Sequence, residues 1–81
     1  MKVTVQCFGH YADVFGSDAK IYSVQPGAAV ADLVKQLESQ YPSMANLSAR
    51  CRFAVNEEYT QLDTVLQEGD VVAVIPPMSG G

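Results

Sequence analysis

Residues 71–81 are Val-Val-Ala-Val-Ile-Pro-Pro-Met-Ser-Gly-Gly. Five consecutive apolar residues predict a β-strand that lies at the centre of a sheet and is covered on both faces. A proline has no backbone N–H to give to a sheet, so the strand must end at Ile75. The sequence therefore predicts a folded domain over residues 1–75 and an extended C-terminal tail over residues 76–81.

The predicted tail has one chemically useful group, the carboxylate of Gly81. At about 3.3 Å per residue, six extended residues reach roughly 20 Å from the domain. Pro76 and Pro77 stiffen the start of the tail, while two terminal glycines without side chains can enter a narrow channel. A carboxylate is a poor electrophile until a partner converts it to a mixed anhydride, for example with AMP. The activated group could then accept sulfur or acylate a lysine.

The rest of the chain predicts four more strands and one main helix. Alternating apolar and polar residues predict the strands, and turn residues separate one strand from the next. The helix follows from one apolar stripe, and Pro42 ends it. It has no capping side chain, although Asp32 complements its N-terminal dipole. The strands are expected at residues 2–8, 20–25, 51–56 and 59–61, and the helix from about residue 28 to residue 40, with the stripe formed by Val30, Leu33, Val34, Leu37 and Tyr41.

The connections are predicted from spacing and turn residues. Residues 9–16, between two glycines, should form one or two helical turns, and residues 43–50 a loop. Leu62, Val65 and Leu66 should form one tight turn under the core. One amphipathic helix and several strands favour an α+β roll, in which the helix crosses one face of a mixed sheet.

Composition narrows the range of functions. The chain has 81 residues, a net charge of −4 and only five scattered Lys and Arg residues, which argues against nucleic-acid binding. Its longest aliphatic run is far shorter than the roughly twenty residues of a membrane span, so we expect no membrane partner. The first residues do not resemble a signal peptide, which favours a cytoplasmic location.

We find no self-contained catalytic centre in the sequence. Cys7 and Cys51 alternate with apolar residues and are expected to be buried as small hydrophobic side chains. His10, the only histidine, has no nucleophile at a recognisable spacing, and no metal-binding or nucleotide-binding motif is present. We therefore expect no enzyme activity from the chain on its own, no metal and no bound cofactor.

Residues 66–81 follow the pattern Leu-x-x-Gly-Asp-x-Val and Pro-Pro-x-Ser-Gly-Gly, and residues 54–56 and 30–42 agree as well. In these motifs the whole chain resembles the small subunits of molybdopterin synthase, which are sulfur carriers of the ubiquitin-like β-grasp superfamily. The resemblance implies a β-grasp roll in which the first and last strands pair in parallel at the centre of the sheet.

The resemblance also implies partners and roles. An E1-like adenylating enzyme would use ATP to adenylate Gly81, which would then become a thiocarboxylate and give its sulfur to the cyclic pyranopterin precursor in molybdenum cofactor biosynthesis. The tail, formed by Pro76, Pro77, Met78, Ser79, Gly80 and Gly81, would enter a pocket of the large synthase subunit, which supplies catalysis. Phe8, Val74 and Ile75 would either contact the partner or pack in the core.

Three other functions are compatible with the same sequence. One is a sulfur carrier for another pathway, such as thiamine synthesis, although such chains are usually shorter and lack the two prolines. Another is a ubiquitin-like modifier that forms isopeptide bonds with lysines. The third is a β-grasp interaction module with an inert tail.

Overall fold

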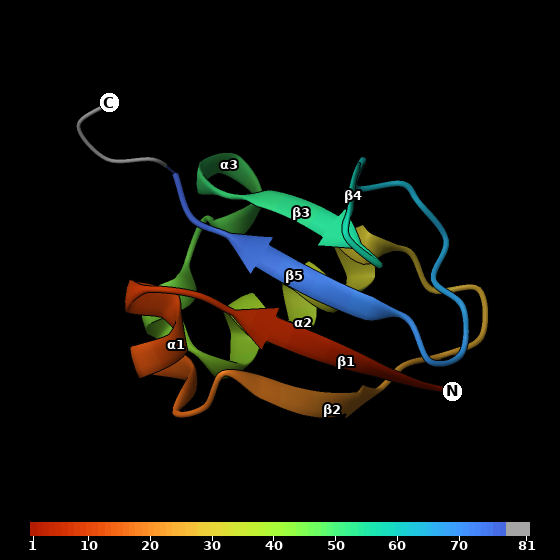
Figure 1. The fold of residues 1–81 in the computed structure, drawn as a ribbon, viewed down its shortest axis with the longest axis horizontal. Coiled ribbons are helices and arrows are strands. Elements are labelled where there is room, and N and C mark those ends of the chain that lie inside the picture. Colours follow the sequence, from red (N-terminus) through yellow and green to blue (C-terminus); the bar gives the residue numbers. More distant parts are fainter. Residues whose placement is uncertain (78–81) are drawn as a thin grey trace.

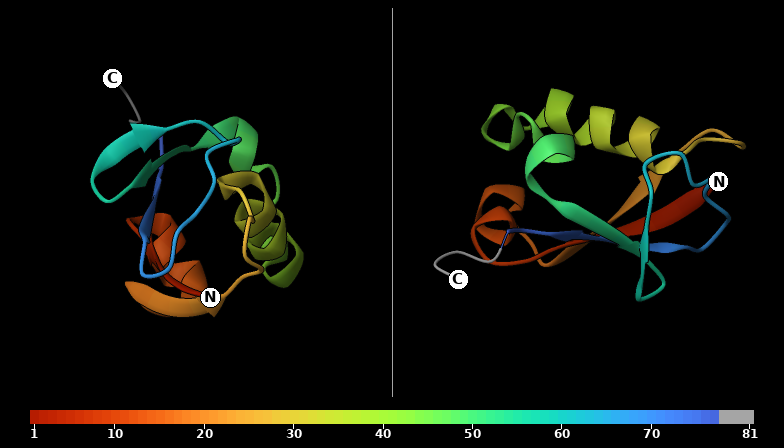
Figure 2. Two further views of the ribbon diagram at one scale, coloured as in Figure 1. Left: turned by 90° about the vertical axis from the view of Figure 1, so that its right-hand side faces the viewer. Right: turned by 90° about the horizontal axis from the view of Figure 1, so that it is seen from above.

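The computed structural model describes residues 1–77. It contains a mixed five-stranded sheet of order β2-β1-β5-β3-β4, with helix α2 lying across one face (Figures 1 and 2). This arrangement confirms the α+β roll. The elements are β1 (Lys2–Cys7), α1 (His10–Phe15), β2 (Ala19–Ser23), α2 (Val30–Gln40), the 3-10 helix η1 (Pro42–Met44), α3 (Leu47–Arg50), β3 (Arg52–Val55), β4 (Glu58–Thr60) and β5 (Val71–Ile75).

Strand β5 lies at the centre of the sheet. It pairs in parallel with β1, where Cys7 faces Val74, and antiparallel with β3, where Arg52 faces Ile75. The parallel pairing implied by the family resemblance is confirmed. Because β1 and β5 run in the same direction, both strands end at the same edge of the sheet (Figure 1).

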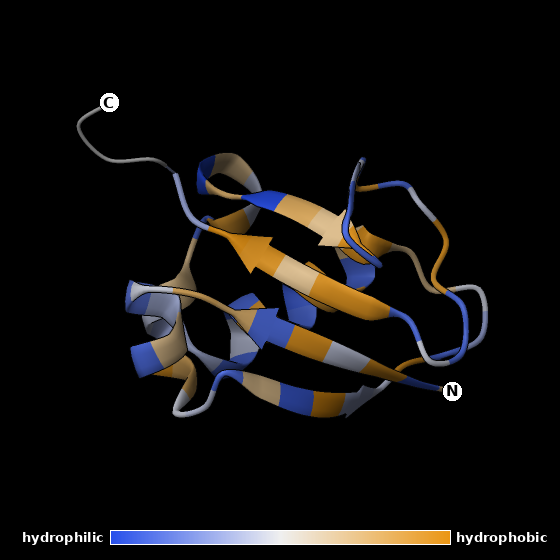
Figure 3. Ribbon diagram, viewed as in Figure 1, coloured by the Kyte–Doolittle hydropathy of each residue, from blue (hydrophilic) through white to orange (hydrophobic). Residues whose placement is uncertain are grey.

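The prediction that β5 is covered on both faces was wrong. Val72 and Val74 are buried against the helices, but Val71, Ala73 and Ile75 on the other face are only half-buried. Figure 3 shows that every residue of β5 is apolar or nearly so. The apolar run therefore reflects one core face and one apolar face that the described residues leave partly open.

Helix α2 buries the predicted stripe and has an unusual N-terminus. Val30, Leu33, Val34 and Leu37 are buried, as the periodicity predicted. The Asp32 carboxylate accepts a hydrogen bond of 2.8 Å from the backbone N–H of Ala29, which replaces the missing capping side chain. Thus the acidic residue in the first turn stabilises the helix by a direct hydrogen bond as well as by its charge.

The sequence predicts a loop at residues 43–50, and this prediction is wrong. The segment contains η1 and α3, and its two large apolar side chains, Met44 and Leu47, are both fully buried. Each of these helices is about one turn long and buries a single residue. No repeating apolar pattern can arise over such a length, so periodicity could not detect them.

The connection from β4 to β5 also differs from the prediction. Leu66 is buried, but Val65 is 51% exposed, so these residues do not form one tight turn under the core. Instead a turn at residues 62–63 is followed by a single bridge between Val65 and Ala29 and a 2.8 Å hydrogen bond from the N–H of Leu66 to the carbonyl of Ala28. This segment ties β5 to the start of α2.

The turn before β5 is fixed by a nearly buried carboxylate. Asp70 accepts hydrogen bonds from the side-chain amide of Asn56, at 2.9 Å, and from the backbone N–H of Gln67, at 2.7 Å. The side-chain oxygen Oδ1 of Asn56 in turn accepts a hydrogen bond from the backbone N–H of Val71 at 3.0 Å. These bonds hold the start of β5 in register. Over residues 1–77, none of the helices has the length and apolar character needed to cross a membrane.

Candidate functional site

The chain leaves the sheet at the end of β5, beside the end of β1. The position that a Cβ would take on Gly9 lies 4.0 Å from Cγ of Pro76. Gly9 has φ 57° and ψ −134°, a conformation that side-chain-bearing residues rarely adopt. The glycine lets the backbone after β1 turn away while Pro76 lies against it. The start of the predicted tail therefore lies close to the segment that follows β1.

An apolar surface covers the sheet face opposite α2 and reaches the end of β5. We call it the open-face patch, and it has two exposed aromatic side chains, with Phe8 47% and Tyr59 68% accessible. Its members line a depression of about 290 Å³, together with Gln6, Ala54 and Glu57. Exposed aromatic side chains grouped around an apolar centre are typical of protein-binding surfaces. The patch consists of Phe8, Tyr59, Val71, Ala73 and Ile75.

A groove with a basic rim adjoins the patch at the start of the tail. Pro76 and Pro77 line it, with Tyr59 and Ile75 shared with the open-face patch. Arg50 and Arg52 also line this groove, so it holds two of the five cationic side chains of an acidic chain. The Arg52 guanidinium carbon lies 5.7 Å from the centre of the Tyr59 ring, a cation–π arrangement that holds the charge beside the ring.

The structure divides the predicted contact residues among the open-face patch, the basic groove and the core. Phe8 and Ile75 belong to the open-face patch, and Pro76 and Pro77 line the basic groove. Val74 has no exposed surface, so of its two alternatives, partner contact and core packing, the structure shows core packing. The predicted roles of Met78, Ser79, Gly80 and Gly81 lie outside the described residues.

Sequence reasoning missed Tyr59, Val71 and Arg52 as site residues. Tyr59 lies in a three-residue strand among polar neighbours, and Val71 was assigned to a fully covered strand. The alternation of Arg52 with buried Phe53 was an available clue that Arg52 lies on the open face. Only the register between β3 and β5 places Arg52 opposite Ile75.

Neither cysteine has the properties of a reactive thiol. Burial, with a smaller contribution from neighbouring Cys51, raises the pKa of Cys7 from 9.0 to about 11. Burial likewise raises the pKa of Cys51, and the Tyr11 hydroxyl and Arg50 only partly oppose this. Cys7 is buried as predicted, whereas Cys51 is only partly buried. A thiol with a raised pKa holds little thiolate at neutral pH, so neither side chain is suited to carry sulfur.

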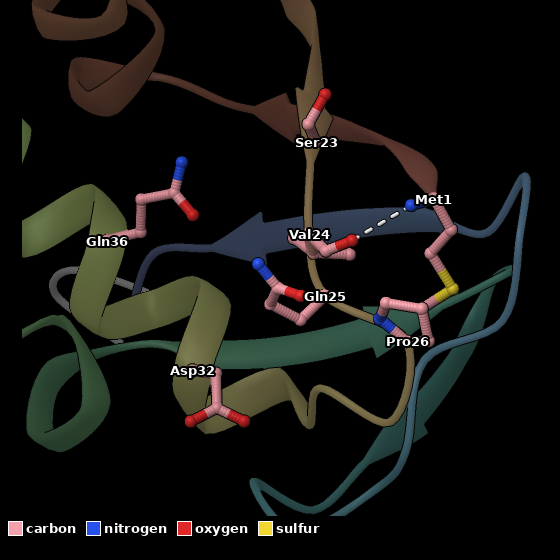
Figure 4. Close-up of a pocket in the computed structure, with 7 residues that line it drawn as sticks. All are labelled: Met1, Ser23, Val24, Gln25, Pro26, Asp32 and Gln36. Atoms are coloured by element: carbon pink, nitrogen blue, oxygen red, sulfur yellow. Dashed lines mark hydrogen bonds between the residues drawn. The ribbon is translucent and has the colours of Figure 1, made fainter.

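Another cavity lies at the opposite end of β1, far from the end of β5 along the sheet. It has a volume of about 400 Å³ and lies between the N-terminus, the end of β2 and the first turns of α2 (Figure 4). The amine of Met1 donates a 2.9 Å hydrogen bond to the carbonyl of Val24 beside it. Asp32, on its wall, is already engaged in capping α2. Within residues 1–77, no group of three or more His, Cys, Asp or Glu side chains could hold a metal ion.

The strand order, the crossing helix and the central last strand define a ubiquitin-like β-grasp protein. The model of the ThiS family matches residues 5–81, and the chain belongs to this family.

The sequences of two relatives align with almost the whole length of this chain. It is 37% identical to the human "Molybdopterin synthase sulfur carrier subunit", covering 99% of this chain and 94% of the relative. The protein of the same description from Mycobacterium tuberculosis is 38% identical, with 100% of this chain and 99% of the relative covered. The solved structure of small archaeal modifier protein 1 from Haloferax volcanii superposes with a TM-score of 0.86 at 25% identity, and the whole of each chain is covered.

Proposed function

We propose that this chain is the sulfur carrier subunit of a molybdopterin synthase and that the carboxylate of Gly81 carries the sulfur. The observation that carries the proposal is the placement of β5. The strand is held at the centre of the sheet and ends at a rim where the open-face patch and the basic groove meet. A protein that binds this rim receives the residues that follow Pro77.

Sulfur transfer through Gly81 takes place in three steps. The Gly81 carboxylate attacks the α-phosphate of ATP, which forms an acyl adenylate and releases pyrophosphate. A sulfide equivalent then displaces AMP, which leaves a C-terminal thiocarboxylate. This group gives its sulfur to the cyclic pyranopterin precursor, and water restores the carboxylate. Activation is needed because a carboxylate does not react with sulfur nucleophiles at a useful rate.

We assign catalysis to the partners rather than to this chain. An E1-like adenylating enzyme binds the ATP, and the large synthase subunit holds the precursor while the tail enters its pocket. The raised pKa values of Cys7 and Cys51 support this division, because they leave the terminal carboxylate as the better site for sulfur. We propose that the chain holds no cofactor of its own and acts in the cytoplasm, where ATP is available.

The open-face patch and the basic groove are the proposed contact surface. Phe8 and Ile75 give apolar contacts, and Pro76 and Pro77 restrict the direction of the tail. We add Tyr59 to the proposed contacts, because it lines both the patch and the groove.

Reconstitution tests the proposal. The chain is incubated with its cognate adenylating enzyme, ATP and a sulfide donor, and then with the cognate large subunit and the cyclic precursor. We expect dithiolene product in amounts that match the thiocarboxylated chain supplied. Thiocarboxylate without dithiolene would instead support the carrier of another pathway.

The structural similarity to a small archaeal modifier protein favours a second candidate, protein conjugation. In that case the activated Gly81 would acylate lysines of other proteins. Heavier, lysine-linked species in cell extract, lost when Gly81 is removed, would identify this role.

A further inference from the structure

The open-face patch is flanked by opposite charges at its two ends. Arg52 lies beside Ile75, where β5 ends, while Glu57 lies in the turn after β3, beside the start of β5. Arg52 and Val55 are separated by three steps of extended strand, about 10 Å, and Glu57 lies beyond Val55 in the turn. This separation exceeds the Debye length of about 8 Å at physiological ionic strength, so each charge acts on a partner separately.

The positive end is built to remain accessible. Arg52 is exposed, and the ring of Tyr59 lies against its guanidinium group. Arg50 is exposed on the same groove. Its position in the last turn of α3 also suits the helix dipole, so Arg50 has a structural role as well. Arg52 lies in β3, outside the helix, so it has no role of this kind. It is therefore the stronger candidate for a partner contact.

The negative end is formed by a residue in a strained conformation. Asn56 and Glu57 have φ values of 52° and 71°, as a two-residue hairpin turn of this type requires. Asn56 tolerates this conformation and anchors the turn to Asp70. Glycine is the least strained residue at the second position, where this chain has Glu57. The Glu57 side chain lines the depression with Gln6 and Val71. The hairpin itself therefore does not account for the glutamate.

We propose that these two ends make the open-face patch a polarised docking surface for the large synthase subunit. The complementary surface would have an apolar centre, a carboxylate that faces Arg52 and a cationic side chain that faces Glu57. This inference rests on the proposed function and adds the charge pattern of the partner. Opposite charges at the two ends fix the orientation of the partner, and only one orientation brings its pocket to Pro77.

A second copy of the chain fits this surface less well. Two copies related by a twofold axis could place Arg52 of one against Glu57 of the other. Each copy has a net charge of −4, however, so the two would repel each other over the rest of their surfaces. Such a dimer would also leave the partner without access to the patch.

Charge-reversal variants of the full chain test the proposal. Affinity and association rate with the cognate large subunit are measured for Arg52→Glu and Glu57→Lys at about 50 mM and about 500 mM salt. The controls are Lys35→Glu and Asp63→Lys, which make the same charge changes at exposed positions away from the patch. We expect each reversal on the patch to weaken binding about tenfold at low salt, mainly through slower association, and much less at high salt. The controls should stay within about twofold.

The possible outcomes separate the inference from the proposed function. If the unaltered chain does not bind the large subunit, the proposed function fails and the inference falls with it. If it binds, but both patch variants behave like their controls, only the inference is overturned. An effect confined to the adenylating enzyme, or a dimer of the chain that Arg52→Glu dissociates, would also overturn it. Thermal unfolding identifies misfolded variants, and Arg52→Gln and Glu57→Gln then replace them.

Discussion

Gly9 and Pro76 lie against each other at the rim of the sheet, with 4.0 Å between the Cβ position of Gly9 and Cγ of Pro76. One residue follows the end of β1 and the other the end of β5. Because the two strands are parallel neighbours, their exits are held side by side. The first residue of the predicted tail therefore lies close to a glycine that is distant in sequence.

Gly9→Ala should destabilise the domain and disturb this rim. A side chain at φ 57° and ψ −134° is strained, which costs about 1–3 kcal/mol, and its methyl group would contact Pro76. Gly16→Ala is the control, since φ 78° and ψ 9° is a milder left-handed conformation with open space around it. Urea unfolding should show the greater loss for Gly9→Ala, and binding to the large subunit should weaken only in that variant. Equal losses in both would contradict the account.

Val74 and Ile75 are neighbours that should respond in opposite ways. Val74 is fully buried, so Val74→Ala should lower the free energy of unfolding by about 2–3 kcal/mol through lost burial and a residual cavity. Ile75 is half-buried on the open face, so Ile75→Ala should cost less than about 1 kcal/mol but weaken partner binding. Unfolding curves and binding isotherms, measured on both variants, test the assignment of the two faces. A partner-binding loss larger in folded Val74→Ala than in Ile75→Ala would contradict it.

Much of the fold could be predicted because its long elements repeat a pattern. The stripe of α2 and the alternation in β1 identify which side chains are buried, and Pro76 ends β5. Such evidence is local. It could not detect η1 and α3, whose buried Met44 and Leu47 lie in single turns. Nor could it show that the second face of β5 stays half-open, since this depends on where the helices pack.

Glu57→Gly should stabilise the protein. Glycine adopts the observed φ of 71° without steric cost, so the free energy of unfolding should rise by about 0.5–1 kcal/mol. The matched change Glu57→Gln keeps the strain and should leave stability within about 0.5 kcal/mol. If the strained glutamate serves partner binding, both variants should bind the large subunit more weakly, although only one is more stable. Destabilisation by Glu57→Gly would refute the strain argument.

Stability should fall at alkaline pH because of the buried thiol. The pKa of Cys7 is about 11 in the folded chain and 9.0 without burial. Below pH 9 the thiol is protonated in both states and has no effect on folding. From pH 9 to about 11 only the unfolded chain releases the proton, which favours unfolding.

Urea unfolding between pH 8 and 11 measures this effect. Cys7→Val keeps an apolar side chain and should lose less stability over the range. Tyr11, Tyr22 and Cys51 also have raised pKa values through burial, so part of the decline should remain. Identical slopes for Cys7→Val and the unaltered chain would contradict the role of Cys7.

The candidate site was predicted in part. The two prolines and the terminal glycines pointed to the C-terminal segment, and Phe8 and Ile75 proved to lie on one surface with Pro76 nearby. Tyr59 and Arg52 were missed because a surface built from β3, β4 and β5 depends on sheet register. Two residues that alternate correctly along their own strands give no indication of which strand lies beside them.

Intact-mass measurement of sulfur transfer tests the central claim most directly. The chain, a variant lacking Gly81 and a form whose terminal carboxyl is an amide are each incubated with the cognate adenylating enzyme, ATP and a sulfide donor. We predict that only the unaltered chain exchanges one oxygen for sulfur, with the change located on Gly81, while all three unfold within about 0.5 kcal/mol of one another. Sulfur on the shortened or amidated form, or on Cys7 or Cys51 of the unaltered chain, would contradict the claim.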